Sequence, residues 1–166
     1  MAARLRIVLV FATTVIGLSP AWGGDLHQLW DRQCGGCHGH AGPFARRSLV
    51  EVDGRLVGRA SGRDLAELLT IHNGGYGPED IASFRIMLAA QLATPPLYAE
   101  RCGACHDTAA ELIRDLVIRG DDGDLRGRAG GHRLAEFLPA HGTLSADQTR
   151  AIMSVLDRVE SEVNHR

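Results

Sequence analysis

Aromatic residues make up only 5% of this 166-residue sequence, and lysine is absent, so all 18 basic residues are arginines. The absence of lysine supports no functional conclusion. The scarcity of aromatic side chains is more informative, because a chain of this length forms either one ordinary domain or two very small ones. Units of about 70 residues usually need a disulfide, a metal or another large buried group for stability. The composition therefore predicts that a bound group completes the core.

Long apolar runs are absent after the N-terminus, which excludes a membrane-spanning segment in the rest of the chain. The one apolar run, residues 7–18, follows Arg4 and Arg6 and precedes a short segment, 19–23, that is suited to cleavage. This order is typical of a signal peptide. A membrane anchor is the alternative, but the run is shorter than the roughly 20 residues that cross a bilayer. We expect residues 1–23 to be removed and the mature chain to be periplasmic.

An excess of positive charge is also absent. The sequence has 18 basic and 20 acidic residues, a net charge of −2 with histidine neutral. Loss of the two N-terminal arginines makes the mature chain more acidic, at about −4. This charge balance argues against a nucleic-acid partner.

Cysteine is rare, and all four cysteines lie in two copies of one pattern. In each copy two cysteines three positions apart are followed directly by a histidine: Cys34, Cys37 and His38, then Cys102, Cys105 and His106. Cys-x-x-Cys-His is the attachment motif of c-type haem, in which both thiols bond to the haem edge and the histidine becomes the proximal iron ligand. On a helical turn, residues three apart face the same side and can reach one porphyrin edge together. The sequence therefore predicts two covalently attached haem c groups.

Three other uses of the cysteines are weaker. Two sequential Cys-x-x-Cys disulfides would close very small loops and add little stability. A thioredoxin-like motif would lie in a strand-rich unit, and no strand pattern occurs near either site. A zinc site built from two cysteine pairs is possible, but it would not require a histidine directly after each pair.

An internal repeat extends well beyond the cysteines. Residues 54–72 align without gaps on residues 123–141, and 11 of the 19 positions are identical. Such self-similarity indicates a tandem duplication of one haem-binding unit. Both copies end in a histidine, His72 and His141.

Each repeated histidine extends an apolar stripe at helical spacing. The stripes are Leu65, Leu68, Leu69 and His72 in the first copy, and Leu134, Phe137, Leu138 and His141 in the second. This period predicts that the histidine faces whatever the stripe covers. Pro139 predicts that the second helix ends or kinks near Leu138. New helices are expected at Pro78 and, through a capping box, at Ser145.

With these features the mature chain resembles the class I c-type cytochromes over nearly all of its length. The resemblance implies an all-α fold of two tandem small helical domains, each wrapped around a covalently bound haem: residues 24–92 and 97–166, joined by a linker at 93–96. In that family the distal ligand is usually a methionine on the loop before the last helix. His72 and His141 stand there, which implies histidine on both faces of each iron and a lower potential than histidine with methionine. Met87 and Met153 remain the alternative distal ligands.

The remaining histidines and two arginines have weaker assignments. We expect four histidines to be solvated rather than ligating: His27, His40, His132 and His165. Arg59 and Arg128 stand at equivalent positions of the repeat and could pair with haem propionates. Surface solvation is the alternative for both arginines.

An iron with histidine on both faces has no vacant position, so the sequence predicts an electron carrier rather than an enzyme. Its partners would be redox proteins of unknown identity, and the oligomeric state is not indicated. Two alternatives stay open: a di-haem enzyme or sensor of the peroxidase type whose distal ligand leaves, and a cytochrome subunit that associates peripherally with a membrane oxidoreductase. The chain is short for a di-haem peroxidase.

Overall fold

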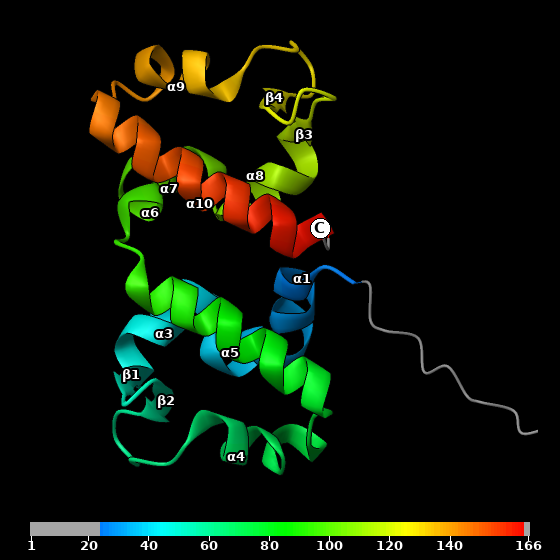
Figure 1. Ribbon diagram of the computed structural model, residues 1–166, viewed down its shortest axis with the longest axis vertical. Helices are drawn as coiled ribbons and strands as arrows, with labels where there is room; N and C mark the ends of the chain where they lie inside the picture. The colour runs from blue at the N-terminus through cyan, green and yellow to red at the C-terminus, as the bar shows by residue number, and fades with distance from the viewer. Residues whose placement is uncertain (1–23, 165–166) are drawn as a thin grey trace, which may run out of the picture.

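The computed structural model describes residues 24–164, so the predicted signal peptide at 1–23 and His165 lie outside the described residues. The first half of the chain is mainly helical (Figure 1). Its elements are α1 (Leu26–Trp30), the π-helical turn η1 (Asp31–Gly35), α2 (Gly36–His38), α3 (Ala41–Ser48), β1 (Leu49–Val52), β2 (Arg55–Gly58), α4 (Leu65–Leu69), the 3-10 turn η2 (His72–Gly74) and α5 (Pro78–Ala93).

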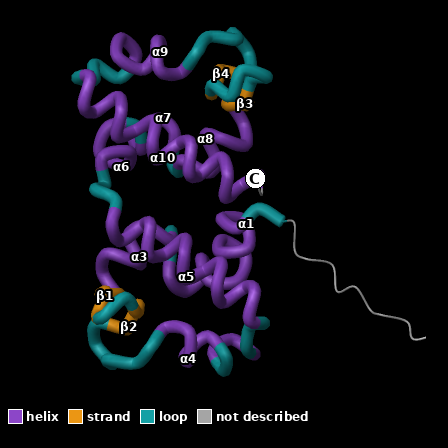
Figure 2. The backbone as a smooth tube through the Cα atoms, viewed as in Figure 1, coloured by secondary structure: helices purple, strands orange, loops and turns teal. Residues whose placement is uncertain are grey.

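The second half repeats this order almost element by element (Figure 2). Its elements are α6 (Leu97–Arg101), α7 (Gly103–His106), α8 (Ala109–Leu116), β3 (Val117–Arg119), β4 (Leu125–Gly127), α9 (Leu134–His141) and α10 (Ala146–Asn164). In each half a long last helix crosses the helices that carry the cysteine motif, and the segment that carries the repeated histidine lies at the far end (Figure 1). The structural repeat thus follows the sequence repeat.

Helices account for 63% of the described residues and strands for 11%, so the predicted mainly helical class is confirmed. The strands form one short antiparallel hairpin in each half, which the sequence did not predict. Leu49 pairs with Gly58 in the first hairpin, and Val117 pairs with Gly127 in the second. Strands of three or four residues are too short to show an alternating pattern that differs from helix. Each hairpin joins the motif-bearing helices to the histidine-bearing segment.

Both predicted starts of the last helices are confirmed. Pro78 occupies the first turn of α5, and before α10 the Ser145 N–H donates to Gln148 Oε1 at 3.0 Å. The helix does not end at Leu138, which was one of the two outcomes predicted for Pro139, because α9 continues through this residue to His141. Proline removes only its own N–H from the ladder, and the Gly142 N–H still donates to the Leu138 carbonyl at 2.9 Å.

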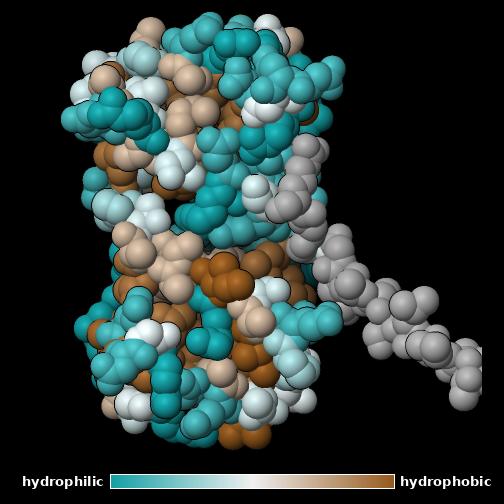
Figure 3. All heavy atoms as spheres, in the orientation of Figure 1, coloured by the Kyte–Doolittle hydropathy of each residue, from teal (hydrophilic) through white to brown (hydrophobic). Residues whose placement is uncertain are grey.

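Each half has its own hydrophobic core. The first contains Trp30, Leu49, Leu56, Phe84, Met87 and Leu88, and the second contains Tyr98, Ile113, Leu125, Ile152, Leu156 and Val159. The last buried residue of the first core is Leu88, and the first buried residue of the second core is Tyr98. The boundary between the cores therefore contains the expected linker at residues 93–96. On the face shown in Figure 3, the first half is more hydrophobic than the second. Helix α5 crosses this face in Figure 1, and its residue Ile86 is 69% exposed.

Helix α1 connects the two halves, since it contacts α10 as well as its own unit. Asp25, the N-cap of α1, accepts hydrogen bonds from the guanidinium of Arg114 on α8. His27 Nε2 lies 2.7 Å from Glu162 Oε2 on α10, and His27 is only 8% exposed. The expectation that His27 is solvated is therefore wrong, because α10 covers it. We call the Asp25–Arg114 and His27–Glu162 pairs the clasp.

Within residues 24–164, no helix combines the length and the apolar character needed to cross a membrane.

Candidate functional site

Both cysteine motifs lie on helical turns, as the sequence predicts. Cys34 belongs to the π-helical turn η1, and Cys37 and His38 follow in α2. Cys102 lies at the junction of α6 and α7, and Cys105 and His106 complete α7. Regular α-helix is thus interrupted at the first cysteine of each motif. Local π-turns inside helices often mark functional sites, because they change the direction of the side chains beyond them.

The thiols have the same exposure pattern in the two halves. All four cysteines are free, the first of each pair is half-buried, and the second is exposed. Burial raises the pKa of the Cys34 thiol, although a hydrogen bond with Tyr76 opposes the shift, and burial also raises the pKa of Cys102. Redox-active Cys-x-x-Cys pairs need a lowered thiol pKa. This direction disfavours a thioredoxin-like role.

An aromatic residue fixes the backbone after each proximal histidine. Trp30 Nε1 donates to the Gly39 carbonyl at 2.8 Å, and the Tyr98 hydroxyl donates to the Thr108 carbonyl at 3.3 Å. At these points the chain turns sharply, with a φ of 68° at Gly39 and 49° at Asp107. The proximal histidines therefore leave their helices at corresponding tight turns.

The structure brings each proximal histidine to the repeated histidine of its own half. The ring centroids of His38 and His72 are 6.0 Å apart, and those of His106 and His141 are 5.9 Å apart. The interplanar angle is 47° in both pairs. An imidazole nitrogen lies about 2 Å from a metal that it binds and about 1.1 Å from the centre of its own ring. Two imidazoles on opposite sides of one metal therefore have ring centroids about 6 Å apart. Both pairs have the spacing of trans ligands.

The surroundings of His38 favour the neutral imidazole. Burial lowers the pKa of His38, and the nearby His72 and Arg47 lower it further. The ring of Phe44 lies edge-on at a centroid distance of 4.8 Å. Only the neutral ring offers a lone pair to a metal, so these contacts prepare His38 for ligation.

An open cavity of about 270 Å³ adjoins the second motif. It is lined by Cys105 and His106, by Leu112 and Leu116 of α8, and by three acidic residues, Asp107, Glu111 and Asp115. The side chain of Leu116 is 48% exposed. A flat apolar group attached at Cys105 would pack on these two leucine side chains.

The structure does not favour zinc. Within residues 24–164, no group of three or more histidine, cysteine, aspartate or glutamate side chains is arranged to hold a metal ion. A structural zinc site needs four protein ligands. Haem iron takes only two ligands from the protein, because the porphyrin supplies the others.

The two methionines do not occupy equivalent positions. Met87 is 0% exposed inside the first core, whereas Met153 packs at the edge of the second core. Neither belongs to the segment that faces a proximal histidine, since Met87 lies within α5 and Met153 within α10. Apolar packing explains both residues.

Several contacts at the sites were missed from the sequence. Phe137 stacks on His141 at a centroid distance of 4.6 Å, and His132 stacks on Phe137 at 5.2 Å. Arg59 donates to the Leu49 carbonyl at 2.9 Å, and Arg128 donates to the backbone at the equivalent hairpin. The repeat itself indicates a shared role for the arginines, and in the structure each ties its hairpin to the preceding chain.

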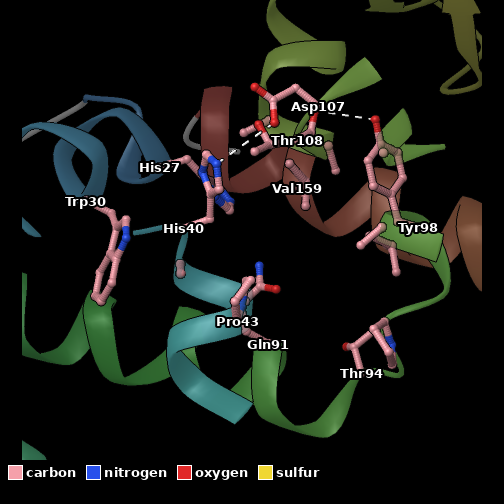
Figure 4. Close-up of a pocket in the computed structure, with 18 of the residues that line it drawn as sticks. His27, Trp30, His40, Pro43, Gln91, Thr94, Tyr98, Asp107, Thr108 and Val159 are labelled. Atoms are coloured by element: carbon pink, nitrogen blue, oxygen red, sulfur yellow. Dashed lines mark hydrogen bonds and ion pairs between the residues drawn. The ribbon is translucent and has the colours of Figure 1, made fainter. Parts of the chain in front are cut away.

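A second cavity, of about 300 Å³, lies between the halves, and Figure 4 shows the side chains around it. Trp30 and Tyr98 lie on opposite sides of this space, and His40 points toward Asp107 across it. His40 Nε2 and Asp107 Oδ1 are 3.9 Å apart. None of the four predicted cysteine ligands or four predicted histidine ligands lines this cavity in the described chain.

Comparisons of the chain with protein-family models, with curated proteins and with solved structures gave no match.

Proposed function

We propose that this chain is a di-haem c-type cytochrome, built like two class I cytochrome domains in tandem, that carries electrons in the periplasm after removal of residues 1–23. One haem would be held by Cys34, Cys37, His38 and His72, and the other by Cys102, Cys105, His106 and His141. The single observation that carries the proposal is the pairing of imidazoles at 6.0 Å and 5.9 Å beside the two thiol pairs.

The two halves would each hold their group in the same way. The two thiols would attach the group covalently, and the histidine after them and the repeated histidine would supply its two protein ligands. A haem iron between two imidazoles supplies one-electron exchange at a lower potential than one with methionine. The turns held by Trp30 and Tyr98 keep the proximal rings in place.

The arrangement of the halves supports transfer between the two sites. His40 follows His38 by two residues, and Asp107 directly follows His106. Because His40 and Asp107 lie 3.9 Å apart, the loops behind the two proximal ligands meet at the boundary between the halves. A short path of bonds and one contact thus joins the two proximal histidines, as a relay requires.

The test is the purified holoprotein, expressed with a working haem-attachment system. We expect a mass of the processed polypeptide plus two haems, colour that acidified organic solvent does not extract, and an optical spectrum without the far-red band of iron–sulfur bonding. A mass equal to the bare polypeptide, or colour that is freely extracted, would contradict haem attachment.

Two variants assign the distal ligands separately. His72→Ala and His141→Ala should each change the spectrum and the magnetic signature of one haem and leave the other low-spin. Spectra that neither substitution alters would show that the distal residues are wrongly assigned, even if both haems are attached.

A further inference from the structure

The two distal histidines are supported differently, although they are equivalent in the repeat. His141 is the last residue of the helix α9, whereas α4 ends at Leu69 and His72 begins the separate turn η2. The divergence lies in the residues around the histidine. Leu68 stands where the second half has Phe137, and Thr70 and Ile71 stand where it has Pro139 and Ala140.

In the second half, movement of His141 would disrupt regular structure. The ring of Phe137, one helical turn earlier, stacks on the His141 imidazole with an interplanar angle of 25°. The Gly142 N–H donates to the Leu138 carbonyl at 2.9 Å, and the Leu144 N–H donates to the Pro139 carbonyl at 3.1 Å. Leu138 and Leu144 are both buried in the second core. To withdraw His141, the chain would have to unwind the last turn of α9 and lose the aromatic stack.

In the first half, His72 has fewer ring contacts, although the Gly75 N–H donates to the His72 carbonyl and the Tyr76 N–H to the Leu69 carbonyl, both at 3.0 Å. Among the described residues the only aromatic or histidine ring in contact with it is His38. The three residues after it all have left-handed backbone, with φ of 52° at Asn73, 87° at Gly74 and 85° at Gly75. Glycine crosses between backbone regions at little cost, so this turn can rearrange without loss of helix. Segments with few buried contacts open at lower free energy than packed helices.

One side chain restrains the turn. Asn73 Nδ2 donates to the Tyr76 hydroxyl at 3.0 Å and to the Gln33 carbonyl at 3.3 Å. Gln33 directly precedes Cys34, so Asn73 ties the distal turn to the segment that carries the first cysteine. The second half has no counterpart of this link among its described residues, since Gly142 follows His141.

We propose that the iron site of the first half opens to a small uncharged ligand such as carbon monoxide, that the site of the second half stays closed, and that Asn73 is the positioning residue that restrains opening. The inference rests on the proposed function and goes beyond it, because it makes one of two equivalent sites a ligand-binding site. With the group bound, the added ligand would take the one coordination position that His72 gives up, so one bond would replace another. No electron is transferred in this step.

The experiment is a titration of the reduced holoprotein with carbon monoxide, monitored by its optical spectrum. We expect one equivalent bound per chain that carries two haems. Zero or two equivalents would overturn the inference. Failure of the proposed function itself would be seen before the titration, as missing haem or as an iron–sulfur band.

Two alanine variants identify which site binds. His72→Ala removes the ligand that competes at the first site, so binding should remain at one equivalent and become tighter. His141→Ala opens the second site permanently, so binding should rise to two equivalents. The reverse pattern would show that the second site is the one that opens, and would overturn the inference.

The role of Asn73 is tested by Asn73→Gly, which removes the amide and tolerates the left-handed backbone. Loss of two hydrogen bonds should tighten carbon monoxide binding by about threefold to thirtyfold. Tyr76→Phe, a milder variant that keeps the ring, should shift affinity in the same direction by a smaller factor. The matched control is Phe137→Leu, which places in the second half the residue found at Leu68 and should leave first-site affinity unchanged. Unchanged affinity in both first-half variants would refute the role of Asn73.

Discussion

Substitution of Met87 tests whether this residue is a distal iron ligand or packs in the hydrophobic core. Its side chain is 0% exposed and lies with Phe84 and Leu88 in the first core. Truncation of a buried methionine to alanine costs about 2–5 kcal/mol, whereas the volume-conserving change to leucine costs less than about 1.5 kcal/mol. We therefore expect Met87→Ala to lower the free energy of unfolding by several kcal/mol and Met87→Leu to lower it little.

The same two proteins also report on the iron. If Met87 only packs, the haem spectrum of Met87→Leu stays identical to that of the unmodified protein, because a histidine remains on each face. The comparison is His72→Ala, which removes an exposed side chain, so it should cost little packing energy but change the spectrum. Denaturant unfolding and the optical spectrum of the holoproteins give both readouts. A changed spectrum in Met87→Leu, with none in His72→Ala, would refute the reasoning.

Three further predictions concern stability. Burial opposes ionisation of Asp25 and Glu162, but Arg114 and the Gln28 N–H lower the pKa of Asp25 from 3.8, and His27 and Arg158 lower that of Glu162 from 4.5. The stability that these two carboxylates contribute should be complete above those values and decline as pH falls below them, in urea unfolding measured against pH. Arg119→Met removes the guanidinium that pairs with Glu160, a residue that is 2% exposed. We expect it to lower the free energy of unfolding by about 3–5 kcal/mol. Adding Glu160→Gln should restore most of this loss, which a double-mutant cycle measures. Asp107→Gly relieves a φ of 49° at the position where the first half has glycine, and should stabilise the chain by roughly 1 kcal/mol in the same assay.

The candidate ligand residues stand out in the sequence because their spacing is local or repeated. The thiols and the proximal histidine lie within five consecutive positions, and such spacing on a helical turn fixes their relative direction. His72 is distant from His38 in sequence, but the second copy repeats the same histidine. A side chain retained at the same place in two diverged copies points to a shared contact. The pairs at 6.0 Å and 5.9 Å are consistent with that reasoning.

Backbone detail could not be predicted as well. The regular stripe at Leu65–Leu69 suggests a helix that reaches His72, yet that helix ends earlier, while α9 continues through Pro139. Proline is the sixth of eight residues in α9, so only the carbonyl of the exposed Ala135 loses its partner, and water can replace it. In the first half the glycines after His72 make a turn available instead. The position at which each helix ends thus depends on the residues that follow the apolar stripe more than on the helical propensity of the stripe.

The contact between the halves has no signal in the sequence at all. His27 and Glu162 are separated by 135 positions, and neither belongs to the repeated segment. A histidine on a short helix and a glutamate near the end of a long one each look like ordinary surface residues. Only the packing of α1 on α10 makes them partners.

Duplication therefore accounts for the chemistry of both sites but not for any difference between them. Each half keeps two thiols, a proximal histidine, a distal histidine and an aromatic residue that fixes the proximal turn. The supports of the distal histidines have diverged, with an aromatic stack on a helix in one half and an asparagine-tethered glycine turn in the other. Ligands of the same type set similar intrinsic bond strengths, so any difference in exchange must come from the free energy of moving the segment that carries each ligand. If the proposed haem sites form, any functional asymmetry between them would therefore depend on Asn73 and Phe137 rather than on the Cys-x-x-Cys-His motifs.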